Sequence, residues 1–238
     1  MVVFENGPLN VRTFEVKQSK YDNLPRLSAR YCFLAPSGGG KTSCLVNLLT
    51  DGYKGCFSAI YVWSHSIHVD PSWSSVKTMI DKMGTGGYYD EFLDVDLREV
   101  LDEHQRIVEL QKNNKNPPKT IHSCAIVLDD IVDNPRFRHS NALETLAIRG
   151  RHSGITLFCT AQKLKLIPPV MRTNFSDWLI WAMNSRTELQ QIIEENSAII
   201  SMEELYRLYF RAIREKYSFL WINKRDRTFH VKFGPAEN

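Results

Sequence analysis

The stretch that decides the fold is Ala35-Pro-Ser-Gly-Gly-Gly-Lys-Thr42. It fits the pattern of a phosphate-binding loop, except that Ala35 stands in place of the usual first glycine. Its three glycines, 38–40, allow the backbone to curl until several N–H groups point at one phosphate. A short apolar run, 30–34, precedes the stretch and a helix-like segment, 43–49, follows it, which is the placement that such a loop requires. The sequence therefore predicts a nucleotide-binding site here rather than a flexible glycine turn.

The residues of this loop have distinct chemical tasks. The side chain of Lys41 can reach the β- and γ-phosphates of a nucleotide, and the Thr42 hydroxyl can hold Mg²⁺. The helix that follows adds the positive end of its dipole. We therefore predict a nucleotide-binding set made of Ser37, Gly38, Gly39, Gly40, Lys41, Thr42 and Ser43.

Two aspartates follow a second apolar run, Cys124-Ala-Ile-Val-Leu128, which is typical of a strand buried on both faces. Carboxylates at the exposed end of a buried strand are costly unless a cation neutralises them. Given the phosphate loop, we assign Asp129 to the Mg²⁺ ion, directly or through its coordination shell, and Asp130 to the polarisation of the attacking water. For a lone aspartate at this position, a helix cap is the alternative.

Two further candidates flank the strand predicted over 155–160. Gln162 follows its carboxyl end, where the amide can hydrogen-bond both a γ-phosphate and the attacking water. Arg151 precedes its amino end, and Arg149 lies two residues earlier. An arginine that completes a neighbouring subunit's site can accelerate hydrolysis by about 10³–10⁵, so one of these two arginines is a candidate for that role. A loop glutamine and a solvated surface arginine are the alternatives.

Strands and helices alternate along the chain. Apolar runs predict strands over 30–34, 59–63, 124–128, 155–160 and 178–182, and helical spacing predicts helices over 43–49, 97–108, 140–148, 187–194 and 202–215. Pro71 and the cluster Gly84-Thr-Gly-Gly87 predict a loop over 71–87. Near the end, alternation over 217–223 and 228–233 predicts a β-hairpin whose core holds Tyr217, Phe219 and Trp221.

This order predicts an α/β fold: a P-loop NTPase with a mostly parallel central sheet flanked by helices and a C-terminal β-hairpin. We divide the chain into an N-terminal arm, 1–27, and one P-loop ATPase domain, 28–238.

Composition limits the class of protein. The chain has 238 residues, of which 43% are hydrophobic and 24% charged, as in ordinary globular proteins. Its net charge of +3 excludes a polybasic binder but permits a local basic channel. No apolar run approaches the roughly 20 residues that span a bilayer, and the N-terminus has no secretory signal pattern. We therefore expect an intracellular protein with no membrane span.

The order of these motifs resembles that of the FtsK/HerA group of DNA-translocating ATPases. The resemblance rests on the loop at 35–42, on Leu128-Asp-Asp130, on 151–162 and on Ile167-Pro-Pro-Val-Met-Arg-Thr-Asn174, and it covers roughly residues 28–185. The small size and the aspartate pair make the chain most similar to the genome-packaging ATPases of poxviruses and other double-stranded DNA viruses with jelly-roll capsids.

The resemblance implies a homo-oligomeric ring that hydrolyses ATP between subunits, with Mg²⁺, and drives double-stranded DNA into a capsid. A capsid-vertex or inner-membrane protein is the implied partner, and the viral assembly site in the host cytoplasm, or the virion itself, is the implied location. Carried over residue by residue, the resemblance implies phosphate, metal and catalytic roles for Lys41, Thr42, Asp129, Asp130, a sensor role for Gln162 and a role in trans for Arg151.

The sequence departs from the family pattern at two positions. Ala35 replaces the first glycine of the loop, and Asp130 stands where many cellular relatives carry the longer glutamate. Two other functions also use a phosphate loop. A nucleotide kinase would need an arginine-rich lid and an acceptor site, neither of which the sequence contains. A capsid-associated protein that uses nucleotide as a switch, with little turnover, is the other alternative.

Overall fold

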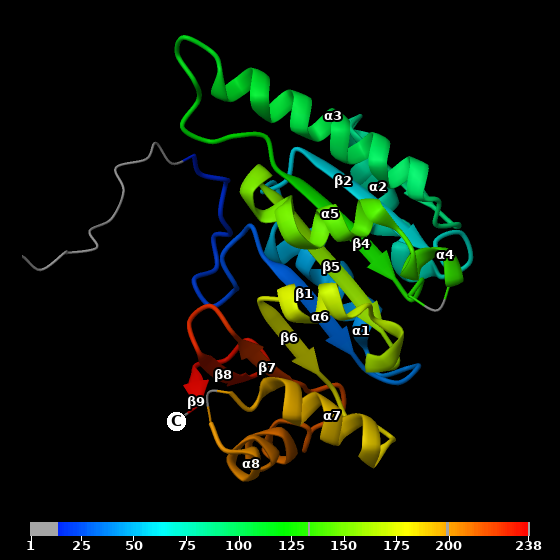
Figure 1. Cartoon of the computed structure of the whole chain (residues 1–238), viewed down its shortest axis with the longest axis vertical. Helices are drawn as coiled ribbons and strands as arrows, with labels where there is room; N and C mark the ends of the chain where they lie inside the picture. Colours follow the sequence, from blue (N-terminus) through cyan, green and yellow to red (C-terminus); the bar gives the residue numbers. More distant parts are fainter. Residues whose placement is uncertain (1–13, 133, 199, 238) are drawn as a thin grey trace, which may run out of the picture.

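A computed structural model of the chain describes residues 14–132, 134–198 and 200–237. These residues form a nine-stranded sheet with the order β3-β2-β4-β5-β1-β6-β7-β8-β9 (Figure 1). The first six strands are parallel: β1 (Arg30–Leu34), β2 (Ala59–Ser64), β3 (Gly86–Tyr89), β4 (Cys124–Asp129), β5 (Ile155–Ala161) and β6 (Asp177–Ile180). The last three are antiparallel: β7 (Leu220–Asn223), β8 (Thr228–Val231) and β9 (Ala236–Glu237).

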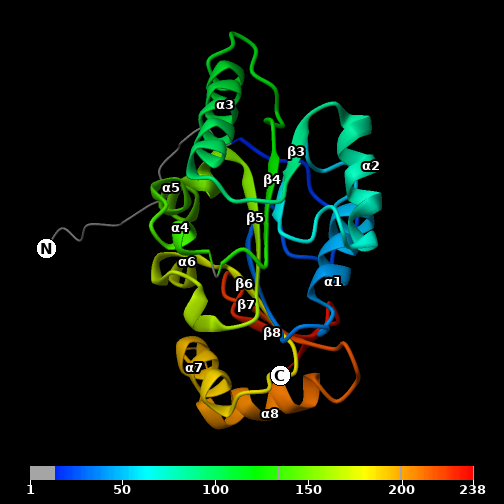
Figure 2. The ribbon, with the colours of Figure 1, turned by 90° about the vertical axis from the view of Figure 1, so that its right-hand side faces the viewer.

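Helices cover both faces of the parallel strands (Figure 2). One face is covered by α1 (Lys41–Asn47) and α2 (Ser74–Met83), and the other by α3 (Asp94–Lys112), α4 (Pro135–Arg138), α5 (Asn141–Arg149) and α6 (Pro169–Asn174). Two more, α7 (Arg186–Asn196) and α8 (Met202–Ala212), lie beyond β6. No helix in the described ranges is both long and apolar enough to cross a bilayer.

Burial on both faces explains why the central strands are continuous apolar runs. All six residues of β4 are buried. Along β1, Tyr31 and Phe33 pack into the core that contains α1, whereas Cys32 and Leu34 pack into the core on the other face. Side chains thus alternate between two cores with the period of two that a strand imposes. The predicted α/β architecture, with a mostly parallel sheet and a C-terminal hairpin, is confirmed.

The loop predicted over 71–87 is wrong, since this segment contains α2 and β3. Val76 and Ile80, one helical turn apart, are buried against the sheet. At Gly86 a Cβ would lie 2.2 Å from the Ile60 carbonyl oxygen. Glycine is therefore required there for two reasons: an edge strand approaches the backbone of β2, and the φ of +113° is one that L-residues rarely adopt. Of the predicted N-terminal arm, residues 1–13 lie outside the described residues, and the boundary at residue 28 stays a prediction.

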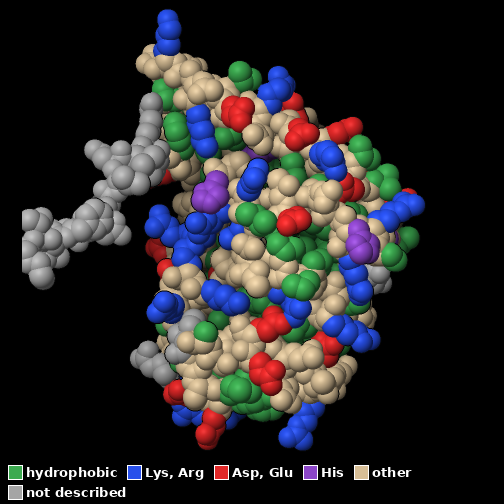
Figure 3. Space-filling view, in the orientation of Figure 1, with side chains coloured by type: hydrophobic (Ala, Val, Ile, Leu, Met, Phe, Trp, Pro, Cys, Tyr) green, Lys and Arg blue, Asp and Glu red, His purple; other side chains and the backbone are tan. Residues whose placement is uncertain are grey.

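The two ends of the parallel strands differ in charge. Figure 3 shows Lys and Arg side chains gathered at the left edge, over the amino ends of the strands. A hollow at these amino ends is lined by three arginines, Arg26, Arg151 and Arg225. A pocket at the carboxyl ends is lined instead by four aspartates and one lysine, namely Asp51, Asp70, Asp129, Asp130 and Lys41.

Asp177, at the start of β6, is a buried carboxylate that is 2% exposed. It accepts hydrogen bonds from the Trp221 indole N–H at 2.9 Å and from the Ser176 hydroxyl at 2.7 Å. Burial raises the pKa of Asp177 from 3.8 to about 6, because these bonds and the nearby Arg225 compensate the lost hydration only in part.

We expect Asp177→Asn to gain stability relative to the wild type as the pH rises from 4 to 7. Because the folded-state pKa is raised, the contribution of the protonated carboxyl is full below pH 3.8 and is lost as the pH passes about 6. This difference corresponds to roughly 3 kcal/mol in the free energy of unfolding. Urea unfolding of both proteins across this range measures it, with Asp102→Asn on the exposed face of α3 as the control. A difference that stays constant with pH would contradict the assignment.

Candidate active site

The predicted phosphate loop joins β1 to α1 at the carboxyl edge of the sheet. Gly38 and Gly40 have φ angles of +72° and +100°, which side chains of L-residues rarely adopt. At Gly39 a Cβ would lie 2.7 Å from the Cβ of Ala35. Ala35 is fully buried, so its methyl group occupies space beneath the loop and the absence of a side chain at Gly39 accommodates it. The unusual first residue of the loop is therefore compatible with the glycine curl.

Lys41, the first residue of α1, is 4% exposed. Its ammonium donates hydrogen bonds to the carbonyl oxygens of Ala35 and Pro36, at 2.9 and 3.3 Å, and lies 3.7 Å from a carboxylate oxygen of Asp130. It faces a pocket of about 820 Å³, within the range that holds small-molecule ligands. All seven residues of the predicted nucleotide-binding set line this pocket: Ser37, Gly38, Gly39, Gly40, Lys41, Thr42 and Ser43.

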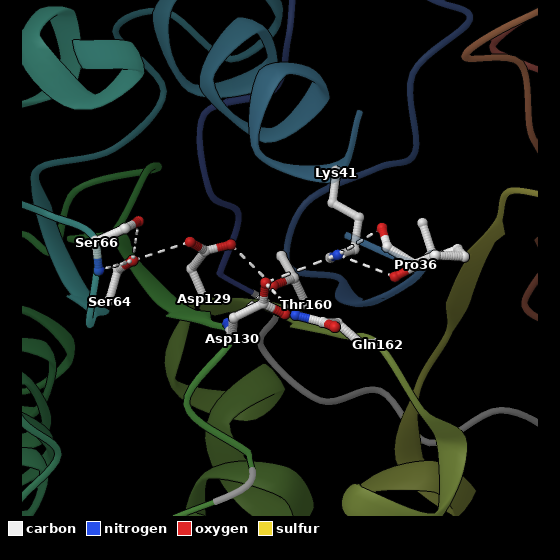
Figure 4. A network of polar contacts seen from close by, with 9 residues as sticks. Pro36, Lys41, Ser64, Ser66, Asp129, Asp130, Thr160 and Gln162 are labelled. Carbon is white, nitrogen blue, oxygen red and sulfur yellow. Dashed lines mark hydrogen bonds and ion pairs between the residues drawn. The ribbon is translucent and has the colours of Figure 1, made fainter. Parts of the chain in front are cut away.

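Asp129 is held between two hydroxyl groups (Figure 4). Thr160 Oγ1 donates to Asp129 Oδ1 at 2.8 Å, and Ser64 Oγ donates to Oδ2 at 2.9 Å. These three residues meet because β2, β4 and β5 are neighbours in register, with Ser64 beside Asp129 and Asp129 beside Thr160. Burial and the charge of Asp130 raise the pKa of Asp129, and the two hydroxyls and Lys41 offset this only in part. A cation at this carboxylate would favour its ionised form.

Asp130 leaves the strand in a left-handed conformation, with φ +49°. This turn brings its carboxylate toward Lys41, and the Gln162 amide donates a long hydrogen bond to Oδ2 at 3.4 Å (Figure 4). The other oxygen, Oδ1, is buried and has no hydrogen-bond partner in the described part of the chain. Strained backbone and unpaired buried acceptors are features that cluster at functional sites.

The residues present fit a triphosphate and a divalent cation. The glycine curl and the Lys41 ammonium offer donors to phosphate oxygens. Thr42 and Asp129 line the same pocket and supply a hydroxyl and a carboxylate. Mg²⁺ commonly binds through one or two such protein groups, with the remaining positions taken by water and substrate phosphates. The Asp130 carboxylate lines the same pocket and can accept a hydrogen bond from water there.

A family profile described as Poxvirus A32 protein matches residues 16–222. The chain belongs to this family. The match spans the phosphate loop, the aspartate pair and Gln162, and it confirms the resemblance to viral genome-packaging ATPases that the order of the motifs indicated.

One curated relative is the uncharacterized protein 075L of Invertebrate iridescent virus 6, which is 24% identical over 100 residues. The aligned residues are 42% of this chain and 39% of that protein. The A32-family chain thus spans about two fifths of the length of the curated relative that it matches.

Solved structures share the fold. The genome packaging NTPase B204 from Sulfolobus turreted icosahedral virus 2, in complex with AMP, has a TM-score of 0.60 at 14% identity over 86% of this chain and 96% of that chain. Its complex with sulfate also reaches 0.60, at 16% identity over 89% and 98%. ATPases 2 and 3 of EssC from Geobacillus thermodenitrificans reach 0.54 at 14% identity, over 78% of this chain and 40% of that chain. At these identities the likeness shows the fold alone.

The structure brings most of the predicted site residues of the A32-family chain together. Lys41, Thr42, Asp129 and Asp130 line one pocket. Gln162 lines an adjoining hollow on the other side of Asp130. Asp130 therefore stands between the two spaces.

Arg151 and Arg149 are not part of this group. Arg151 is exposed in the short helical turn Gly150–Ser153, ahead of the amino end of β5, whereas Gln162 follows its carboxyl end. The seven residues of β5 separate the two ends by roughly 20 Å. Arg151 is therefore far from the pocket of its own chain, and its predicted role in trans stays a prediction.

Sequence reasoning missed three residues at the site. Ser64 and Thr160, which hold Asp129, are polar residues at the carboxyl ends of neighbouring strands, and that position was the available signal. Tyr217 was predicted in the hairpin core, but it lines the nucleotide pocket and is 57% exposed. Its φ is +63°, its carbonyl accepts a hydrogen bond from the Trp181 indole, and a Cβ at Gly40 would lie 3.4 Å from its ring. Because the chain turns at Tyr217, this residue does not share the inward-outward alternation of the strand that follows, and of the three predicted aromatic residues only Phe219 and Trp221 are buried in the hairpin core.

The two aspartates should differ when each is changed to asparagine. We expect Asp130→Asn to retain binding of ATP with Mg²⁺ but to lower kcat by about 10²–10⁴, because it removes a base beside the attacking water. Asp129→Asn should raise the Kd for ATP with Mg²⁺ about tenfold or more, because it removes a metal-side carboxylate. Nucleotide titrations and steady-state hydrolysis measure both effects, with Asp102→Asn as the control. Equally poor binding by both variants would contradict this division of roles.

Proposed function

We propose that this chain is the motor subunit of a viral genome-packaging machine, which hydrolyses ATP and drives double-stranded DNA into a capsid. The observation that carries the proposal is the buried Lys41 ammonium facing Asp130 beside the glycine curl, in a chain of the Poxvirus A32 family. The relatives in fold support it, because B204 is a genome packaging NTPase whose structures include complexes with AMP, AMPPCP and ATP-gammaS.

The residues of the pocket divide the work of hydrolysis among them. The Lys41 ammonium exchanges its carbonyl partners for phosphate oxygens, which are stronger acceptors because they are charged. Asp130 orients and polarises the attacking water, and the Gln162 amide steadies that carboxylate. When bound, Mg²⁺ at Thr42 and Asp129 neutralises charge on the β- and γ-phosphates.

The working form in this proposal is a homo-oligomeric ring around duplex DNA. The described lining of the nucleotide pocket includes no arginine, while Arg151 lies at the far end of the sheet. A neighbouring subunit is therefore the natural source of the arginine that stabilises transition-state charge. A protein of the capsid vertex or of an inner membrane is the further partner, and the viral assembly site in the host cell is the place of action.

The first test is ATP hydrolysis with and without duplex DNA. We expect turnover that duplex DNA stimulates, and we expect Lys41→Ala to lower it by roughly 10³-fold or more, because no other lysine lines the pocket in the described residues. Lys82→Ala, on the exposed surface of α2, is the matched control. A nucleotide-switched protein would bind ATP with little turnover, and a kinase would transfer phosphate to a nucleotide rather than to water.

A second test concerns Arg151 and uses mixed rings. Arg151→Ala and Lys41→Ala should each be inactive alone, because each removes one half of a shared site. When the two are mixed, some interfaces pair an intact Lys41 with an intact Arg151 from the neighbour, so activity should partly return and rise with protein concentration. Mixtures no more active than either variant, in rings proven to have exchanged subunits, would exclude Arg151 and leave Arg149 as the next candidate.

A further inference from the structure

A hollow of about 360 Å³ opens at the amino ends of β1 and β5. Arg26, Arg151 and Arg225 line it, from the segment before β1, the turn before β5 and the turn after β7, respectively. Segments that are far apart in the sequence thus deliver three guanidinium groups to one place. We refer to this site as the arginine hollow.

The charge of the arginine hollow is not compensated by ion pairs. None of its three arginines, nor Arg30 beside them, forms an ion pair within 4.0 Å with a described residue. Burial, followed by the charges of Arg151 and Arg225, lowers the pKa of Arg30, and its Nε is buried with no described partner. Two carboxylates also line the hollow, those of Glu15 and Asp226, and Asp226 accepts a hydrogen bond from Asn223.

One guanidinium group of the hollow, that of Arg225, and the neighbouring one of Arg30 are each fixed by hydrogen bonds to backbone carbonyls. Arg225 donates to the carbonyl oxygens of Arg26 and Ser28, at 3.2 and 2.9 Å, and Arg30 donates to the carbonyl oxygen of Ala147. Fixed donors are what stabilisation of developing charge requires, because they need not reorganise during the reaction. Contacts that merely neutralise a duplex backbone have no such requirement, and long flexible side chains satisfy them.

The nucleotide pocket, in contrast, has few positive charges. Lys41 is the one Lys or Arg among its described lining residues, against four aspartates. A triphosphate at this end of the sheet needs further cations, and the arginine hollow lies at the opposite end, roughly 20 Å away. The two surfaces can therefore meet only between two copies of the chain. Such a head-to-tail contact joins unlike surfaces and produces a ring when the rotation closes.

We propose that the arginine hollow docks against the nucleotide pocket of a second copy of this chain, and that Arg225 acts there in trans together with Arg151. The inference rests on the proposed function and adds a second arginine to its shared site. The occupant of the hollow is thus the phosphate end of a neighbour's nucleotide.

The test uses Arg225→Ala in mixed rings of the full-length protein. Alone, it should hydrolyse ATP roughly 10²-fold more slowly, because it removes one fixed donor to transition-state charge. Mixed with Lys41→Ala, it should recover part of the wild-type rate. Mixed with Arg151→Ala, it should recover nothing, because both arginines reach the same site from the same neighbour. Arg227→Ala, on the same turn but outside the hollow, is the matched control.

The possible outcomes separate this inference from the function on which it rests. Recovery in the mixture with Arg151→Ala would overturn it, since Arg225 would then serve a different site from Arg151. A loss of duplex DNA affinity with DNA-free hydrolysis unchanged would also overturn it and assign Arg225 to DNA. Failure of the wild type to hydrolyse ATP would instead refute the proposed function. Because Arg225 also ties down the segment before β1, Arg225→Lys and a thermal melt serve as folding controls: a folded lysine variant that is as slow as Arg225→Ala supports a bidentate role.

Discussion

The buried carboxylate of Asp129 is the constraint around which the three neighbouring strands are arranged. A charge at 2% exposure is costly, and the protein meets the cost with one hydroxyl from each adjacent strand rather than with an ion pair of its own. That solution works only when β2, β4 and β5 are in one register, because a slip of one residue would turn Ser64 or Thr160 to the opposite face. The positions of the side chains around Asp129 therefore depend on the register in which the strands pair.

The two ends of the parallel strands carry side chains of different charge. Their carboxyl ends collect the loop donors, Lys41 and the aspartates, whereas their amino ends collect arginines without ion-pair partners among the described residues. Neither end is electrostatically complete within one chain. The proposed head-to-tail assembly would join the two, and ATP hydrolysis would then depend on the contact between subunits, which is the coupling that a ring motor needs.

The C-terminal hairpin links these two ends. Strand β7 is antiparallel to β6, so it starts near the carboxyl ends of the parallel strands and finishes near their amino ends. Tyr217, just before β7, borders the nucleotide pocket, and Arg225, just after it, borders the arginine hollow. The aromatic residues between them, which include Phe219 and Trp221, are buried.

The sequence by itself determined the phosphate loop, the aspartate pair and the α/β order of elements, because each is encoded in a short stretch: glycines followed by lysine, or an apolar run ending in carboxylates. It did not reveal the strand β3, since Gly86 resembles a turn glycine in the sequence, and its close approach to Ile60, a residue far away in the chain, is visible only in the fold. Tertiary structure alone decided that Ser64 and Thr160 hold Asp129, that Tyr217 faces the nucleotide pocket, and that Arg151 and Arg225 meet at the far end. The physical reason is that strand order and register place these residues in space, and neither can be read from local periodicity.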